Sequence, residues 1–159
     1  MADTKVDQAI IDTLNTVLTG ELTAVNQYVL HAKMVENWGY KRLYKVMWHE
    51  SIDEMKHATE LIDRILYLGG LPNLQKLGRL RIGETVPEMM ENDLALENEA
   101  VPRLNEGIAQ CVASGDNGTR QLFDAILKSE EEHVDWIEEQ QDMIARIGLQ
   151  NYLTTQVGV

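Results

Sequence analysis

The sequence has 159 residues, of which 44% are hydrophobic and 25% charged, as is typical of one globular domain with a single core. A formal net charge of −12, from 26 acidic and 14 basic residues, argues against binding to nucleic acid or to an anionic membrane surface. The one cysteine excludes a disulfide framework within the chain, and no apolar run approaches the roughly 18 residues of a membrane span. We therefore predict a single domain, residues 1–159, in a cytoplasmic protein without a membrane segment.

Apolar residues recur at helical spacing in the first half of the chain. They predict a first helix that starts after a cap at Asp3 or Thr4 and is interrupted at Trp38-Gly39. A second helix is expected over about residues 40–68, because Gly69-Gly70 supplies the left-handed stop that ends many helices.

The second half of the chain repeats this pattern. A capping hydroxyl at Thr85, a proline and then a glutamate predict the start of a third helix, which ends at residues 114–118. Pro102 lies inside this helix, where we expect a kink because proline removes one backbone hydrogen bond. A fourth helix covers about residues 119–147, and the tail after Gly148 is expected to form a short C-terminal helix.

The lengths of the connections predict the topology. Tight turns join helices one and two, and helices three and four, so each pair forms an antiparallel hairpin. Residues 71–85 have no helical periodicity and reach about 50 Å when extended, enough to run the length of a 30-residue helix. We predict an all-α four-helix bundle in which this crossover leaves the second and third helices parallel.

Glutamate precedes histidine by three residues once in the second helix and once in the fourth, giving the pairs Glu54 with His57 and Glu130 with His133. Glu54 and Glu130 are 76 residues apart, and so are Glu21 and Glu97 on the apolar faces of helices one and three. In the alternative reading these glutamates are solvated and the histidines are ordinary residues. The repeated 76-residue spacing favours a functional cluster.

Position along the hairpins places the four glutamates at one level. Glu21 and Glu54 are centred on the turn at Asn37-Trp38, and the other two are centred on the turn at Ala113-Ser114. Four carboxylates in an apolar bundle would repel one another and lose hydration. Two divalent cations balance the four negative charges, and two neutral imidazoles complete ligand sets that suit iron, manganese or zinc.

The segments GELTAVNQYVLHAKM, HESIDEMKHATELIDRILYLGGLPNLQ, LALENEA, EEEHVDWIEEQ and GLQNYL resemble bacterioferritins, and the resemblance covers essentially the whole chain. It implies a ferritin-like bundle with a ferroxidase centre. In that centre Glu54 and Glu130 would bridge two irons, Glu21 with His57 would complete one site, and Glu97 with His133 the other.

One tyrosine is expected beside this centre. Tyr28 lies seven residues beyond Glu21 on the same helix face; in the alternative reading it is a core aromatic whose hydroxyl is satisfied elsewhere. Some members of the family have another tyrosine one turn after the second-helix histidine, where this chain has Leu61.

Helices one and two have a second apolar face. The residues on it include Leu22, Asn26, Val29, Trp48, Ile52 and Met55, and the stripe continues through Thr59 and Ile62. Because a helix with two apolar faces buries one of them against a partner, we predict a dimer made through these helices. From the residues alone, Met55 fills that interface. The resemblance implies instead that Met55 from each of two subunits ligates a shared haem b, whose pocket is lined by Leu22, Asn26, Val29, Trp48 and Ile52.

His49, Glu50 and Asp53 precede the second-helix motif and in one reading are only a solvated surface. The resemblance suggests that they form an auxiliary iron site. The sequence indicates no role for His31 or Cys111.

The predicted function is iron storage with ferroxidase activity. Two Fe(II) would be oxidised by dioxygen or hydrogen peroxide, and the Fe(III) stored as a mineral inside a hollow homo-oligomer. The resemblance implies a 24-subunit shell built from twofold dimers, with a redox partner protein that delivers electrons for iron release. Two alternatives remain open: a di-iron peroxidase or oxidase that stores no mineral, and a metal-free helical dimerisation protein.

Overall fold

The computed structural model describes residues 7–158, and over this range it contains five helices and no strand, which confirms the all-α prediction. The helices are α1 (Gln8–Asn37), α2 (Lys41–Tyr67), α3 (Val86–Ser114), α4 (Asn117–Ile147) and α5 (Leu149–Thr154). Within the same range, no helix combines the length and the apolar character that crossing a membrane requires.

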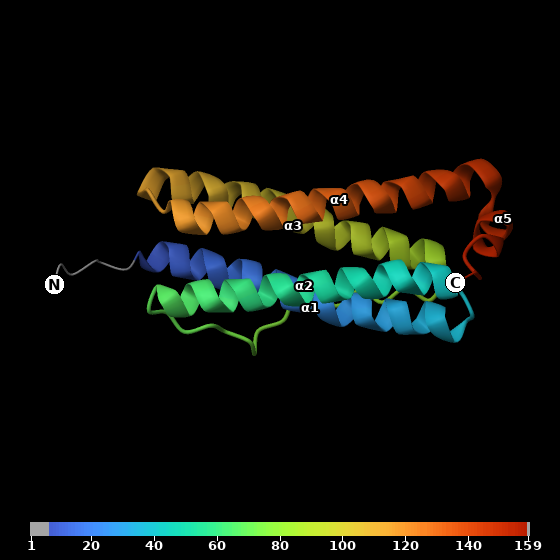
Figure 1. The fold of residues 1–159 in the computed structure, drawn as a ribbon, viewed down its shortest axis with the longest axis horizontal. Coiled ribbons are helices and arrows are strands. Elements are labelled where there is room, and N and C mark those ends of the chain that lie inside the picture. The colour runs from blue at the N-terminus through green and yellow to red at the C-terminus, as the bar shows by residue number, and fades with distance from the viewer. Residues whose placement is uncertain (1–6, 159) are drawn as a thin grey trace.

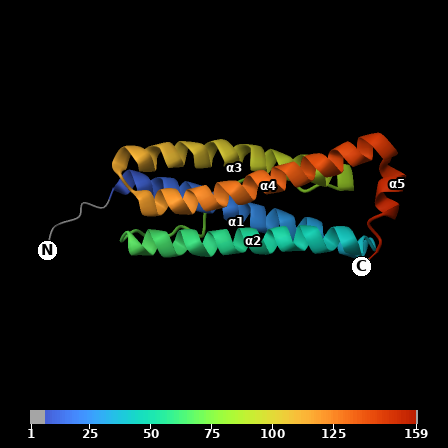
Figure 2. The same cartoon turned by 45° about the horizontal axis from the view of Figure 1, so that its top comes forward.

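The four long helices form two antiparallel hairpins, α1 with α2 and α3 with α4 (Figure 1). The segment after α2 returns along the bundle before α3 begins, so α2 and α3 run in the same direction, as the connection length predicted. Helix α5 lies across the end of the bundle at which α1 turns into α2 (Figure 2). The backbone N–H of Arg42 donates to the carbonyl of Gln156 at 3.0 Å and ties the chain end to that turn.

Local chemistry sets where the helices begin. The expected caps Asp3 and Thr4 lie outside the described residues, and Asp7 caps α1 by accepting from the N–H of Ala9. Helix α4 starts at Asn117, two residues before the predicted start, because Asp116 is its cap. Helix α3 continues through Pro102, so the proline does not end the helix.

Two hydrophobic clusters fill the bundle, one toward each end. On α1 the first ends near Leu18 and the second resumes at Ala32. Between these clusters every long helix buries polar residues: they include Glu21 on α1, Glu54 on α2, Glu97 on α3 and Glu130 on α4. Apolar packing on both sides therefore holds a polar layer at mid-bundle, and each well-buried Leu or Ile contributes about 1.5–3 kcal/mol.

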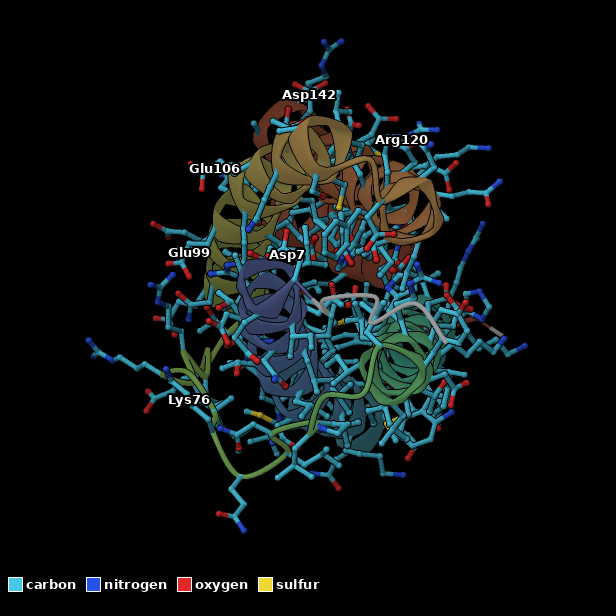
Figure 3. The ribbon with its side chains drawn as sticks, turned by 90° about the vertical axis from the view of Figure 1, so that its left-hand side faces the viewer. Asp7, Lys76, Glu99, Glu106, Arg120 and Asp142 are labelled. Carbon is cyan, nitrogen blue, oxygen red and sulfur yellow. The ribbon has the colours of Figure 1, made fainter. Side chains whose placement is uncertain are left out.

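Charged side chains such as Glu106, Arg120 and Asp142 point away from the bundle axis (Figure 3). Residues 71–85, which we call the strap, lie along α1 and are held by its side chains. The backbone N–H groups of Gly78 and Gly83 donate to Thr23 Oγ1 at 2.8 Å and to His31 Nε2 at 2.9 Å. These contacts satisfy backbone donors that the strap, having no regular secondary structure, cannot satisfy itself.

Candidate metal centre

Six side chains from the four long helices meet in the polar layer. They are Glu21 from α1, Glu54 and His57 from α2, Glu97 from α3, and Glu130 and His133 from α4. The four glutamates are between 1% and 3% exposed, so solvent does little to stabilise their charges. The structure thus brings together every residue that the Glu-x-x-His pattern and the 76-residue spacing singled out.

The six side chains form two overlapping groups, each able to offer ligand atoms within 4.8 Å of one another. One group consists of Glu21, Glu54, His57 and Glu130, and the other of Glu54, Glu97, Glu130 and His133. Only Glu54 and Glu130 belong to both. This geometry is compatible with two metal ions that share two carboxylates and have one carboxylate and one imidazole each.

The buried cluster is incompletely hydrogen-bonded. Within residues 7–158 the atoms without a partner are Glu21 Oε2, Glu54 Oε2, His57 Nδ1, Glu97 Oε2 and Glu130 Oε1. His57 Nδ1 lies 3.3 Å from Glu130 Oε1 and 3.6 Å from Glu21 Oε2, but without hydrogen-bond geometry. Each unsatisfied buried polar atom costs about 1–3 kcal/mol, so this donor set fits a pair of cations better than it fits an empty core.

The electrostatics of the cluster point the same way. Burial raises the pKa of Glu54, and burial together with the charges of Glu54 and Glu97 raises that of Glu130 well above its ordinary range. For Glu97, burial is outweighed by hydrogen bonds from Glu130 and His133, which lower the pKa. Burial acts against charging His133, but its contact with Glu97, 3.2 Å away, raises the pKa of the imidazole to about 9. The metal-free cluster therefore holds protons that bound cations would displace.

Aromatic rings surround His133. Tyr28 is fully buried, donates its hydroxyl to Glu97, and lies edge-on to the imidazole with 5.1 Å between ring centroids. Trp136 stacks on the His133 imidazole, with 6.1 Å between ring centroids and an interplanar angle of 22°. We did not predict Trp136, although an aromatic one helical turn after the histidine was the available signal. Leu61 is buried in the apolar cluster, where it supplies no phenol.

The predicted interface face of α1 and α2 is open to solvent in this chain. Met55 is 45% exposed and Ile52 39% exposed; Asn26 is also exposed, while Leu22, Val29 and Trp48 are half-buried. An accessible thioether on an apolar surface fits the donor set of a haem bound between two such faces.

The predicted auxiliary residues do not all meet. His49 Nε2 lies 3.3 Å from Asp53 Oδ2, whereas Glu50 turns toward the cluster, with its Oε2 3.8 Å from His133 Nδ1. Glu50 is thus an outer neighbour of the candidate metal centre.

The sequence analysis also missed a buried polar network beside the centre. Asp93 Oδ1 receives hydrogen bonds from Gln27 Nε2 and His31 Nδ1, both at 2.8 Å. The side-chain amide oxygen of Gln27, Oε1, accepts in turn from the backbone N–H of Arg81 at 2.9 Å. The network joins α1, α3 and the strap.

Comparison with known proteins agrees with the bundle. Residues 11–147 match the ferritin-like domain family. Bacterioferritins from Mycobacterium bovis and Streptomyces coelicolor are each 46% identical to the chain, over 146 and 151 residues. The alignments cover 92% of both chains for the first, and 95% of this chain and 90% of the relative for the second. A bacterioferritin from Brucella melitensis is 45% identical over 148 residues, covering 93% of this chain and 92% of the relative.

The fold and the carboxylate–histidine cluster thus define a ferritin-like protein. At this identity and coverage, the chain belongs to the bacterioferritin family.

Proposed function

We propose that the protein stores iron and that the mid-bundle cluster is its ferroxidase centre. The observation that carries the proposal is the pair of overlapping ligand groups that share Glu54 and Glu130. Glu21 with His57 would bind one ferrous ion, Glu97 with His133 the second, and the shared carboxylates would bridge them. Ferrous iron is the substrate here, and each ion gives up one electron.

Either of two oxidants balances this reaction. Two Fe(II) supply two electrons, which with two protons reduce dioxygen to hydrogen peroxide, or hydrogen peroxide to two water molecules. The carboxylates can change between bridging and terminal binding as the iron charge rises, while the apolar clusters on either side hold the helices in place. Tyr28, hydrogen-bonded to Glu97, orients that ligand within the centre.

The test is the oxidation of added Fe(II), followed by ultraviolet absorbance. We expect Glu54→Gln and Glu130→Gln to lower the initial rate by about 100-fold, because each removes a shared ligand. Glu132→Gln is the matched control, since Glu132 lies on α4 but is exposed. Unchanged oxidation in the Glu54 and Glu130 variants would favour the metal-free dimerisation protein.

Storage is separable from oxidation by counting iron. A closed shell of chains with a net charge of −12 would concentrate cations, and the similarity to bacterioferritins supports a 24-subunit shell in the cytoplasm. Hundreds of iron atoms per assembly support storage. A ceiling near two per chain supports the alternative, a di-iron peroxidase or oxidase.

The pair His49 and Asp53 would be an auxiliary iron site.

For haem b, we propose that Met55 from each of two subunits would hold the haem iron, and that Leu22, Asn26, Val29, Trp48 and Ile52 would line the pocket. Haem would supply one-electron transfer, taking electrons from a redox partner protein for iron release. Support comes from the exposed thioether on the open face of α1 and α2. Met55→Leu should abolish the haem absorption band, whereas Met47→Leu, a buried control on α2, should keep it. A band retained in Met55→Leu would remove Met55 as the ligand.

A further inference from the structure

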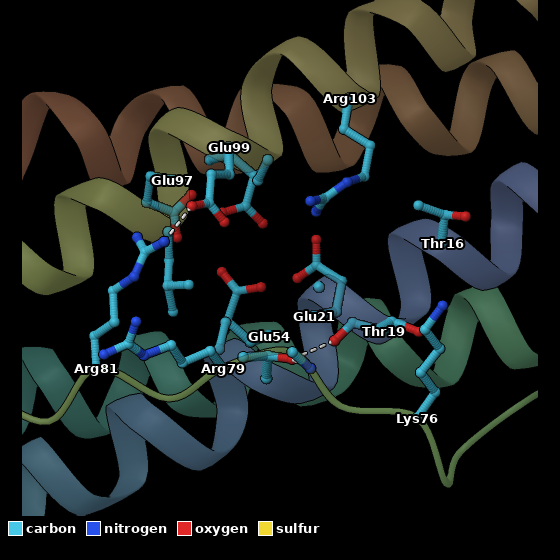
Figure 4. Close-up of a pocket in the computed structure, with 17 residues that line it drawn as sticks. Thr16, Thr19, Glu21, Glu54, Lys76, Arg79, Arg81, Glu97, Glu99 and Arg103 are labelled. Carbon is cyan, nitrogen blue, oxygen red and sulfur yellow. Dashed lines mark hydrogen bonds and ion pairs between the residues drawn. The ribbon is translucent and has the colours of Figure 1, made fainter.

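A cavity of about 280 Å³ lies between α1, α3 and the strap. Its lining includes all four glutamates of the metal centre, Glu21, Glu54, Glu97 and Glu130. It also includes four basic residues, Lys76, Arg79 and Arg81 from the strap and Arg103 from α3, which we call the basic rim. Figure 4 shows the four rim side chains placed around the carboxylates of Glu21, Glu54 and Glu97.

The basic rim is poorly neutralised by its own neighbours. Arg81 forms an ion pair with Glu99 at 2.6 Å. Over the described part of the chain, Lys76, Arg79 and Arg103 form no ion pair within 4.0 Å. Four of the 14 basic residues of a strongly acidic chain thus gather at one cavity, and among the described residues three of them have no ion-pair partner within 4.0 Å, although five glutamates also line the cavity. The basic side chains can attract an anion at the cavity, while the glutamates that line the same cavity attract cations.

The position of the rim is built into the fold. The guanidinium of Arg103 lies against Gly20, where an added Cβ would be 2.5 Å from Nη1. It reaches from α3 toward Glu21 (Figure 4). The strap is held on α1 by the hydrogen bonds from the N–H groups of Gly78 and Arg81 to Thr23 and Gln27, which fix the backbone on either side of Arg79. The fold therefore positions the Arg103 guanidinium and the backbone that carries Arg79, while the side chains of Lys76 and Arg79 are exposed.

We propose that the basic rim binds a small oxyanion with two or more negative charges, with inorganic phosphate as the probe, directly beside the metal centre. Guanidinium groups present paired N–H donors that match the oxygens of such an ion. The proposal goes beyond iron oxidation, since anion binding requires no redox step. The anion would compensate the rim while cations compensate the carboxylates below it.

The first test measures phosphate binding to the metal-free full-length protein by equilibrium dialysis. We expect the double variant Arg79→Gln/Arg103→Gln to bind about 100-fold more weakly, as two charge-assisted contacts are lost. Arg120→Gln is the matched control because Arg120 is a partly exposed arginine on α4, away from the cavity, that forms an ion pair with Asp124. An equal loss in the control would show a response to net charge alone, and unchanged binding in the double variant would also overturn the site.

Gly20→Ala tests the same site without changing any charge. The new methyl group forces the Arg103 guanidinium away from α1, so phosphate affinity should fall about tenfold. The substitution lies inside a helix, where alanine is favoured over glycine, so the variant is expected to fold. Wild-type affinity in this variant would contradict the assignment of Arg103.

Two further arms locate and identify the ligand. Zinc is redox-inert, so repeating the titration with Zn²⁺ at the carboxylates tests proximity independently of ferroxidase activity. Tighter phosphate binding supports the site, whereas unchanged affinity would place the anion elsewhere. Competition between phosphate and citrate separates two sources of the same oxyanion chemistry. If phosphate binds more tightly than citrate, the ligand is free phosphate; if citrate displaces phosphate, the ligand is a carboxylate chelator.

Discussion

His31 accepts a hydrogen bond from the backbone N–H of Gly83 through Nε2, at 2.9 Å, and so fastens the strap to α1. Because a backbone N–H can only donate, Nε2 is the acceptor and Nδ1 carries the proton that is shared with Asp93 at 2.8 Å. The imidazole is fully buried and neutral in this arrangement. One side chain thereby joins two helices to the segment that carries most of the basic rim.

We expect His31→Ala to destabilise the protein by about 2–4 kcal/mol, because Gly83 loses its acceptor and Asp93 loses a donor inside the core. Guanidinium denaturation measures the loss, and hydrogen exchange should show faster exchange of the Gly83 N–H. His49→Ala is the control, since the His49 side chain is 69% exposed, and should change stability by less than about 0.5 kcal/mol. Equal stability of the two variants would mean that the strap is held by its other contacts.

The bundle and the six candidate ligands could be predicted because they follow from short-range patterns. Helical periodicity identifies the buried stripes, and the 76-residue repeat places Glu21 and Glu97 at the level of the Glu-x-x-His pairs. The contact between His31 and Gly83 could not be predicted in this way. It depends on how an aperiodic strap lies against α1, which no local pattern encodes.

The same limit applies to the basic rim. Arg79 lies in the strap and Arg103 lies on α3, and no repeat or helical period in the sequence links the two positions. Only the path of the strap brings them to one cavity. Similarly, Asp93 meets His31 because of the rotation of α3 about its axis, which the apolar stripe of α3 defines only to within a residue or so.

Removing a shared carboxylate should stabilise the metal-free protein. Glu54 and Glu130 are 2% and 1% exposed, and burial raises the pKa of both, so near neutral pH the uncharged or buried carboxyl groups oppose folding when no cation is present. We expect Glu130→Gln to raise the stability of the metal-free protein by about 1–2 kcal/mol, because the amide keeps the shape of the side chain and removes a buried ionisable group. Calorimetry without metal, with Glu132→Gln as the exposed control, measures this effect.

Adding zinc should reverse the order of stability. At 100 times its dissociation constant, a ligand that binds only the folded state stabilises it by about 2.7 kcal/mol. The wild-type protein should gain such a stabilisation, and Glu130→Gln should gain little because it lacks a shared ligand. Equal gains in both proteins would show that zinc binds outside the cluster.

The cap of α4 should make stability depend on pH. For Asp116, burial is outweighed by hydrogen bonds from Thr119 and by Arg64, 2.8 Å away, which lower the pKa below its ordinary value of 3.8. Since the folded pKa is depressed, the stabilisation is fully present above this ordinary value and is lost as pH falls through the lowered pKa.

Asp116→Ala should therefore cost about 1–2 kcal/mol at pH 7, through loss of the cap, and less at pH values below 3.8. Thermal unfolding of both proteins across the pH range measures the difference. Asp124→Ala on the same helix is the control, because its ion pair with Arg120 is exposed and contributes less than about 0.5 kcal/mol. A difference that stays constant with pH would assign the whole effect to helix propensity.

Cys111 should be unreactive in the folded protein. Its side chain is fully buried in the apolar cluster near the turn between α3 and α4, and burial, reinforced by the charge of Asp116, raises the pKa of the thiol to about 11. The thiolate is the reactive form, so at pH 8 a disulfide reagent should label less than about 1% of the native chains in the time that labels a free cysteine. In guanidinium one thiol per chain should react.

Val112→Cys in a Cys111→Ser background is the matched control, because Val112 is 63% exposed on the same helix and should label at once. Rapid labelling of native Cys111 would show instead that this end of the bundle opens frequently, and that the apolar cluster there is less stable than its burial implies.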